Sequence, residues 1–157
     1  MTEKLPPRWF IRTAWVAHRA LYRITRGRVG LARPTEGGRF GMLRLHAIGR
    51  RTGEERIVIL GYYEDGPNLV TLAMNGWGEG EPAWWLNLQA HPRAGVELHG
   101  DFRQVTARAA TGAERERLWA RWREVDEKLD AFAALRPTET AVVVLEPVAA
   151  TGSAAGG

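Results

Sequence analysis

The chain of 157 residues contains no cysteine, which excludes disulfide bonds, thiolate metal sites and a thiol nucleophile. Its four histidines are scattered without the spacing of a metal-ligating pair, so we expect no metal enzyme. No apolar run approaches the roughly 18 residues that span a bilayer, and the first residues lack the apolar core of a signal peptide. These absences predict a cytoplasmic protein that works without a metal.

Lysine is nearly absent as well, since Lys4 and Lys128 are the only two among 22 basic residues. The charge is unevenly placed: residues 1–56 carry thirteen basic against four acidic residues, and residues 57–157 carry nine against fourteen. This asymmetry indicates an anionic partner for the first third of the chain, either nucleic acid, a membrane surface or a multiply charged small molecule. Nucleic acid is not expected, because the arginines of residues 115–123 are compensated by nearby glutamates.

The spacing of apolar residues predicts more strands than helices. Strands are expected at residues 41–48, 55–63, 69–74, 95–99, 102–109 and 141–146. Helices are expected at residues 8–26, at 82–90 and after a capping box at 111–114, the last one burying Trp119 and Trp122. This order favours an α+β, mainly β fold: an antiparallel sheet or barrel with peripheral helices, in one domain over residues 1–147. Residues 148–157 are expected to be a flexible tail.

The turn Gly49–Gly53, with the sequence Gly-Arg-Arg-Thr-Gly, stands between the first two predicted strands, and Arg56 follows it. Two glycines let a backbone turn tightly and bring its N–H groups close to a ligand. Guanidinium groups match phosphate oxygens in pairs, so the turn is interpreted as an anion-binding site. An ordinary basic hairpin turn is the alternative.

A second motif, Pro82-Ala83-Trp84-Trp85-Leu86-Asn87-Leu88 followed by His91-Pro92, comes about thirty residues later. Together the two motifs resemble the deazaflavin-dependent nitroreductase and quinone reductase family, whose members are split β-barrels related to flavin-binding barrels. The resemblance covers nearly the whole chain, from Arg8 to Pro147. It implies a split β-barrel that binds coenzyme F420, a deazaflavin with a phosphate and an anionic polyglutamate tail.

The resemblance also implies which residues bind this cofactor. Its phosphate would be held by Arg50, Arg51, Thr52, the backbone at Gly53, and Arg56. Its ring system would lie along the strand at Ile57 and Ile59, near Asn75 and Gly76, and against Trp84 and Asn87. The last two are three residues apart and therefore share one face of the short helix.

The reaction implied is hydride transfer from the reduced deazaflavin to a quinone, an enone or a nitro compound. The cofactor carries this chemistry, so no catalytic acid–base pair is expected. Nitroreductases of the family carry tyrosines before the last strand, and residues 126–135 have none, which favours a quinone or an enone. We expect the acceptor pocket to involve Met74, Trp77, Leu129 and Phe132. Trp77 either stacks on a ring or anchors its loop.

The membrane contact, the oligomeric state and the identity of the ligand stay open. The predicted helix 8–26 combines aromatic residues with arginines, so it contacts a membrane surface peripherally, or packs on the barrel or a second subunit. The protein is a monomer or a homodimer. An FMN-dependent oxidoreductase and a non-catalytic binder of a lipid or other apolar ligand are the alternative functions. The arginine content favours F420 over FMN, because a tail of carboxylates needs more positive charge than one phosphate.

Overall fold

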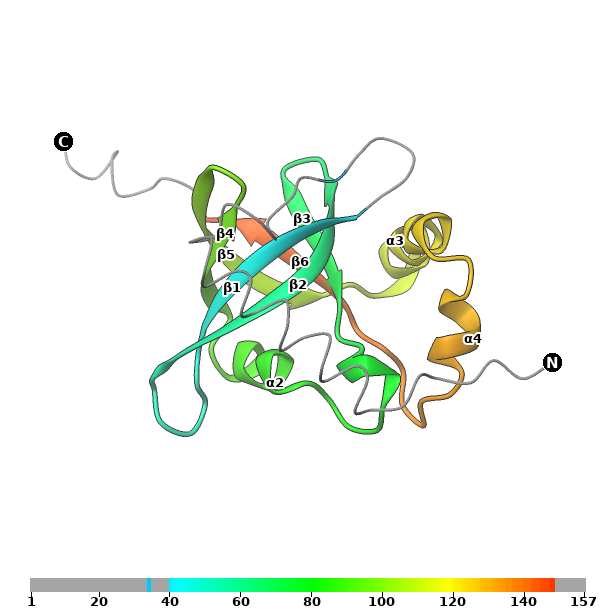
Figure 1. The fold of residues 1–157 in the computed structure, drawn as a ribbon, viewed down its shortest axis with the longest axis horizontal. Coiled ribbons are helices and arrows are strands. Elements are labelled where there is room, and N and C mark those ends of the chain that lie inside the picture. Colours follow the sequence, from blue (N-terminus) through cyan, green and yellow to red (C-terminus); the bar gives the residue numbers. More distant parts are fainter. Residues whose placement is uncertain (1–33, 35–39, 149–157) are drawn as a thin grey trace, which may run out of the picture.

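Six antiparallel strands close into a barrel in the part of the chain that the computed structural model describes, Pro34 and residues 40–148 (Figure 1). The strands follow one another around the barrel in the order β1-β2-β3-β6-β5-β4. Their bounds are β1 Gly41–Ile48, β2 Glu55–Asp65, β3 Asn68–Leu72, β4 Arg93–Leu98, β5 Asp101–Ala109 and β6 Val142–Pro147. The predicted mainly β split barrel is confirmed.

The barrel interior is filled by every second residue of its strands, as the pleat of a strand requires. On β1 the side chains of Leu43, Leu45 and Ala47 are buried, and the residues between them are not. Leu45 lies opposite Val58 on β2 and opposite Val96 on β4, so β1 is hydrogen-bonded on both sides and the barrel closes there.

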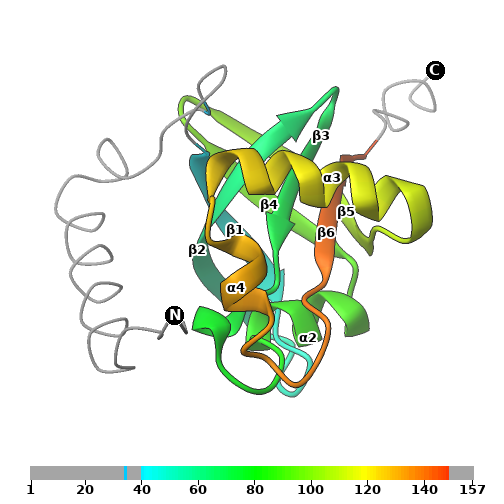
Figure 2. The same ribbon diagram turned by 90° about the vertical axis from the view of Figure 1, so that its right-hand side faces the viewer.

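Helix α2, Ala83–Ala90, lies at one end of the barrel, beside the β1–β2 turn (Figures 1 and 2). It buries Trp85 and Leu88 in the same core as the strands. Pro82 immediately precedes it, which suits a helix start because proline lacks the N–H that the first turn leaves unpaired. The helix therefore presents another face to the β1–β2 turn.

A second apolar core lies outside the barrel, where α3, Gly112–Val125, and α4, Leu129–Ala133, cover β3 and β6 (Figure 2). Its buried members include Val70 and Leu72 from β3 and Val142 and Val144 from β6, with Leu118, Trp122 and Leu129 from the helices. Of the two tryptophans predicted to be core, Trp122 is buried and Trp119 is only partly buried.

The expected capping box at the start of α3 is wrong. Thr111 makes no side-chain hydrogen bond to the helix, and the carboxylate of Glu114 instead accepts two hydrogen bonds from the guanidinium of Arg108 on β5. A charged partner held by a neighbouring strand thus replaces the local backbone contact.

The strands and α2 lie within two residues of their expected ends, a difference that depends on the assignment criteria. Helix α4 was not expected. The predicted helix 8–26 and the predicted tail, apart from Val148, lie outside the described residues. Among the residues described, no helix is both long and apolar enough to cross a bilayer.

Candidate cofactor site

A cavity of about 490 Å³ opens between the β1–β2 turn, the first residues of β2 and helix α2. This volume is typical of small-molecule sites. The lining residues are Gly49, Arg50, Arg51, Thr52, Arg56, Ile57, Val58, Asn75, Pro82, Ala83, Trp84 and Asn87. The two motifs singled out in the sequence are therefore brought together on one cavity.

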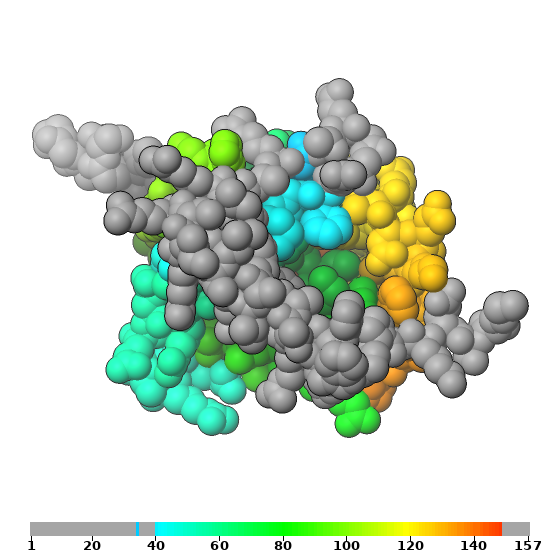
Figure 3. All heavy atoms as spheres, in the orientation of Figure 1, coloured from blue at the N-terminus to red at the C-terminus, as the bar shows by residue number. Residues whose placement is uncertain are grey.

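The β1–β2 turn, residues 49–54, is held by its own backbone and projects from the barrel (Figure 3, teal, lower left). Gly49 N donates to Glu54 O at 2.7 Å, and Gly53 N donates to Gly49 O at 2.8 Å. Gly53 has φ 75°, a conformation in which a side chain would be strained. Its N–H is bonded within the turn and Gly53 does not line the cavity, so the expected ligand contact through its backbone stays a prediction.

Thr52 and Arg51 occupy the exposed tip of this turn. The hydroxyl oxygen of Thr52 accepts a hydrogen bond from Glu54 N at 3.2 Å. Its hydroxyl hydrogen remains to be donated, which suits an anionic ligand.

Asn87 of α2 fixes Arg50 in the turn. Its side-chain oxygen accepts a hydrogen bond from the backbone N of Arg50 at 3.1 Å and a second one from Arg50 Nη1 at 3.0 Å. Asn87 is only 4% exposed, so the contact is shielded from water. The guanidinium of Arg50 is thus oriented before any ligand arrives.

The positive charge at the cavity is not neutralised by nearby carboxylates. Within the described part of the chain, neither Arg50 nor Arg51 forms an ion pair, and the carboxylate nearest to Arg56 is that of Glu54, 3.8 Å away. Of the nine other arginines in the described part of the chain, Arg93 and Arg121 form no ion pair. The other seven are paired at 3.5 Å or less: Arg44, Arg103, Arg108, Arg115, Arg117, Arg123 and Arg136. Such a set of uncompensated guanidinium groups favours an anion.

The rest of the lining is apolar. Ile57 is 39% exposed although it stands on a barrel strand, and Val58 and Trp84 are partly buried beside it. An exposed isoleucine and an indole next to a cationic end suit a ligand with a planar ring and an anionic group. The residues present therefore fit a phosphorylated flavin or deazaflavin.

The loop before α2 contributes Asn75 to the cavity. Asn75, Gly76 and Trp77 form the short 3₁₀ turn η1 with φ of 46°, 60° and 61°. Glycine adopts such angles freely and asparagine tolerates them, but for tryptophan they cost on the order of 1–3 kcal/mol. Contacts elsewhere must hold this loop in place. One of them is the stacking of Trp77 on Phe132 of α4, with ring centroids 6.2 Å apart.

Several residues expected at the cofactor or the acceptor do not line this cavity. Ile59 shares one side of β2 with Ile57, but it lies two residues farther from the turn, opposite Arg44, and does not line the cavity. Val58, on the strand segment expected along the ring, does line the cavity. Gly76 is in the adjacent loop but not in the lining.

The four residues expected around the acceptor lie outside the lining of this cavity, and their role at the acceptor stays a prediction. Leu129 is buried in the core between α3, α4 and the barrel, and Trp77 packs against the same core. Phe132 faces Trp77, and Met74 precedes η1. None of them lines the cavity, so their geometry is that of loop and helix anchors.

Two lining residues, Pro82 and Ala83, were not among the residues expected at the cofactor. Pro82 and Ala83 belong to the second motif and its helix start, so their place beside Trp84 was the available signal. Within the described residues, no group of three or more histidine, cysteine, aspartate or glutamate side chains is arranged to hold a metal ion.

A profile of the F420H(2)-dependent quinone reductase family matches residues 15–147. A Mycobacterium tuberculosis protein whose assigned name is that of an F420H(2)-dependent quinone reductase, Rv3178, is 29% identical over 99 residues, covering 62% of this chain and 82% of that protein.

Two solved structures are similar in fold. One, described as a domain-swapped dimer, has a TM-score of 0.65 and 23% identity, covering 86% of this chain and 99% of its own. The structure of an F420-H2 dependent reductase, FDR-A, has a TM-score of 0.61 and 24% identity, covering 67% and 93%. At these identities the two structures show the fold alone.

The family profile covers most of the chain, and it agrees with the resemblance carried by the turn and by the tryptophan-containing helix. The protein belongs to the F420H2-dependent quinone reductase family, and it is an oxidoreductase whose cofactor is coenzyme F420.

Proposed function

We propose that coenzyme F420 binds with its phosphate against the β1–β2 turn and its deazaflavin ring against Ile57, Val58 and Trp84. The observation that carries this proposal is the contrast within one cavity between uncompensated arginines at the turn and an apolar wall beside them. When reduced, the cofactor supplies a hydride to an electron-poor acceptor.

The chain's own residues bind and orient rather than react. Arg50, held by Asn87, and Arg51 bind phosphate oxygens, and the Thr52 hydroxyl donates to the same group. Arg56, whose nearest carboxylate is 3.8 Å away, attracts the acidic tail. This attraction acts over about 10 Å and is screened by salt. The apolar wall excludes water from one face of the ring.

A quinone is the acceptor that we propose. It accepts the hydride and takes one proton from solvent, giving the quinol. The family name supports this choice, and so does the absence of tyrosine in residues 126–135, where nitroreductases of the family carry several. Since Ile57, Val58 and Trp84 are proposed to cover one face of the ring, the acceptor is proposed to approach the opposite face.

The test is stopped-flow oxidation of chemically reduced F420 by a soluble benzoquinone, followed through the visible absorbance of the oxidised deazaflavin. We expect quinone-dependent oxidation that requires the protein, and little with nitroimidazole. Reduced FMN in place of F420 is the matched control. Turnover with FMN alone would favour the flavin enzyme, and binding of neither cofactor would favour the apolar-ligand binder.

A homodimer is the assembly that we propose, in view of the similar structure described as a domain-swapped dimer. Light scattering coupled to gel filtration distinguishes it from a monomer.

The proposed membrane contact of residues 8–26 is tested by pelleting the chain with anionic vesicles. Equal pelleting of a chain that lacks residues 1–28 would contradict it.

A further inference from the structure

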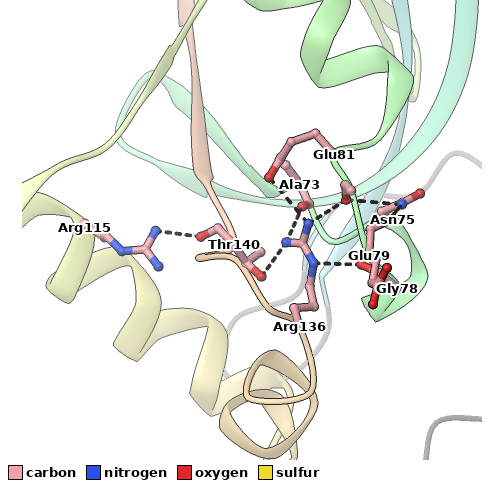
Figure 4. A network of polar contacts seen from close by, with 9 residues as sticks. Ala73, Asn75, Gly78, Glu79, Glu81, Arg115, Arg136 and Thr140 are labelled. Atoms are coloured by element: carbon pink, nitrogen blue, oxygen red, sulfur yellow. Dashed lines mark hydrogen bonds and ion pairs between the residues drawn. The ribbon is translucent and has the colours of Figure 1, made fainter.

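Arg136 is a buried charged residue that does not line the cavity. It stands between α4 and β6, and its side chain is 0% exposed. Figure 4 shows its guanidinium enclosed between Thr140 on one side and the loop that leads to α2 on the other. A buried arginine is costly unless all its donors are paired.

The guanidinium donates four hydrogen bonds and forms one ion pair. Nε donates to Gly78 O at 3.0 Å, and Nη2 donates to Gly80 O at 2.8 Å and faces Glu81 Oε1 at 3.5 Å. Nη1 donates to Ala73 O at 3.1 Å and to Thr140 Oγ1 at 2.8 Å. Three of these acceptors are main-chain carbonyls of the loop, so one rigid fork fixes its backbone at three points.

The loop connects this buried cluster directly to the cavity. Gly80 O, bonded to Arg136, also accepts a hydrogen bond from Asn75 Nδ2 at 3.2 Å, and the same Nδ2 donates to Glu79 O at 2.7 Å. Asn75 lines the cavity, as does Pro82 directly after the loop. A continuous chain of contacts therefore runs from Arg136 through Gly80 to Asn75.

The loop cannot hold this shape by local preferences alone. Three consecutive residues, Asn75 to Trp77, have positive φ, which glycine adopts freely and asparagine tolerates but which strains Trp77. The ion pair with Glu81 compensates the charge of Arg136 locally, so Arg136 adds little to the field that attracts an anion. Its effect on a ligand must come from geometry.

We propose that Arg136 is a positioning residue: it holds the 73–81 loop so that Asn75 and the start of α2 form the wall of the cavity on the side of the ring. The inference rests on the proposed function for the identity of the ligand, but the position of the loop does not depend on any ligand.

The test compares Arg136→Lys and Arg136→Met with Arg115→Lys as a matched control. Arg115 also binds the segment before β6, through Nη1 to Thr140 O at 2.7 Å, but it has no contact with the loop (Figure 4). Lysine at 136 keeps the charge and loses the fork. Circular dichroism selects a temperature at which every variant is folded.

The first measurement is amide hydrogen exchange in the ligand-free protein. Exchange of residues 74–81 is expected to rise about tenfold or more in both Arg136 variants and to stay unchanged in Arg115→Lys. Unchanged exchange in Arg136→Lys and Arg136→Met would overturn the proposal. Because no cofactor is present, this result stands even if F420 binding by the wild type fails.

The second measurement is the affinity for F420 and for the phosphate-free deazaflavin. The Arg136 variants are expected to bind both ligands about tenfold more weakly, with an unchanged salt dependence. Asn75→Ala is expected to weaken binding similarly and to add nothing in the double variant. Additive losses, or a loss confined to F420, would show that Arg136 does not act through Asn75.

Discussion

The side-chain oxygen of Asn87 accepts two hydrogen bonds from Arg50, one from the backbone N at 3.1 Å and one from the guanidinium at 3.0 Å. One buried amide of α2 thus fixes both the main chain and the side chain of a turn 37 residues away. The two sequence motifs of this protein form one unit.

Replacing the side chain of Asn87 tests the link between the two motifs. Asn87→Ala removes both hydrogen bonds, each worth about 1 kcal/mol, and frees the Arg50 side chain. We expect the affinity for F420 to fall about tenfold or more, as measured by tryptophan quenching. Gln89→Ala, an exposed change in the same helix, is the control. An Asn87→Ala protein with wild-type affinity would show that Arg50 needs no orientation.

The salt dependence of F420 binding tests whether Arg51 acts through its charge. Arg51 forms no ion pair within the described residues, so its charge is available to the anionic cofactor. Arg51→Gln is expected to weaken F420 binding and to flatten the dependence of the logarithm of the affinity on salt concentration. Arg93→Gln, at an exposed position on β4, should change neither. A parallel salt dependence in Arg51→Gln and wild type would contradict the assignment of Arg51.

Trp84 should report cofactor binding directly. It is the tryptophan among the lining residues, which also include Ile57 and Val58. Trp84→Phe is expected to remove a large part of the fluorescence quenching by F420, since energy transfer to the ring is strongest from the nearest indole. Trp119→Phe removes an indole of α3 that lies outside the lining, and it should leave the quenching nearly intact. The reverse order would place the ring elsewhere.

Helix α3 is held by carboxylates, so its packing should be sensitive to acid. Hydrogen bonds from the Arg117 and Arg108 guanidinium groups lower the pKa of Asp65 and of Glu114. The Trp119 indole, and then Arg123, lower the pKa of Asp130. A pKa lowered by folding contributes stability that is present above the unfolded value, near 4, and is lost as the pH falls through the folded value.

We therefore expect the thermal midpoint to be flat near neutral pH and to fall below about pH 4. Glu114→Gln should lower the midpoint at pH 7 slightly, because its contact with Arg108 is only partly buried, and should reduce the loss in acid. Near-ultraviolet circular dichroism of Trp122 follows the same transition. If Glu114→Gln loses as much stability in acid as the wild type, the carboxylate does not contribute as described.

The elements formed by contacts between nearby residues could be predicted from the sequence. The alternation of β1 and the turn residues predicted the strands and the first hairpin, and the three-residue spacing of Trp84 and Asn87 predicted that both face the same cavity. These signals lie within one element or between neighbouring elements, where periodicity is informative.

The remainder depends on contacts between distant segments. The sequence around Arg136 does not indicate that its guanidinium binds the main-chain carbonyls of residues 73, 78 and 80, because every residue carries a carbonyl. Nor does the sequence show that the rings of Trp77 and Phe132, 55 residues apart, stack on one another. Glu114 matched a capping box and binds Arg108, since a strand placed beside the helix offers a charged partner.

The central claim is that the β1–β2 turn binds the phosphate of the cofactor. The most direct measurement is the affinity of wild type and of the Arg50→Gln/Arg51→Gln variant for F420 and for the phosphate-free deazaflavin. We predict that the variant loses about a hundredfold or more in affinity for F420 and keeps the wild-type affinity for the phosphate-free ring. Equal losses for both ligands, or unchanged binding of F420, would contradict the claim.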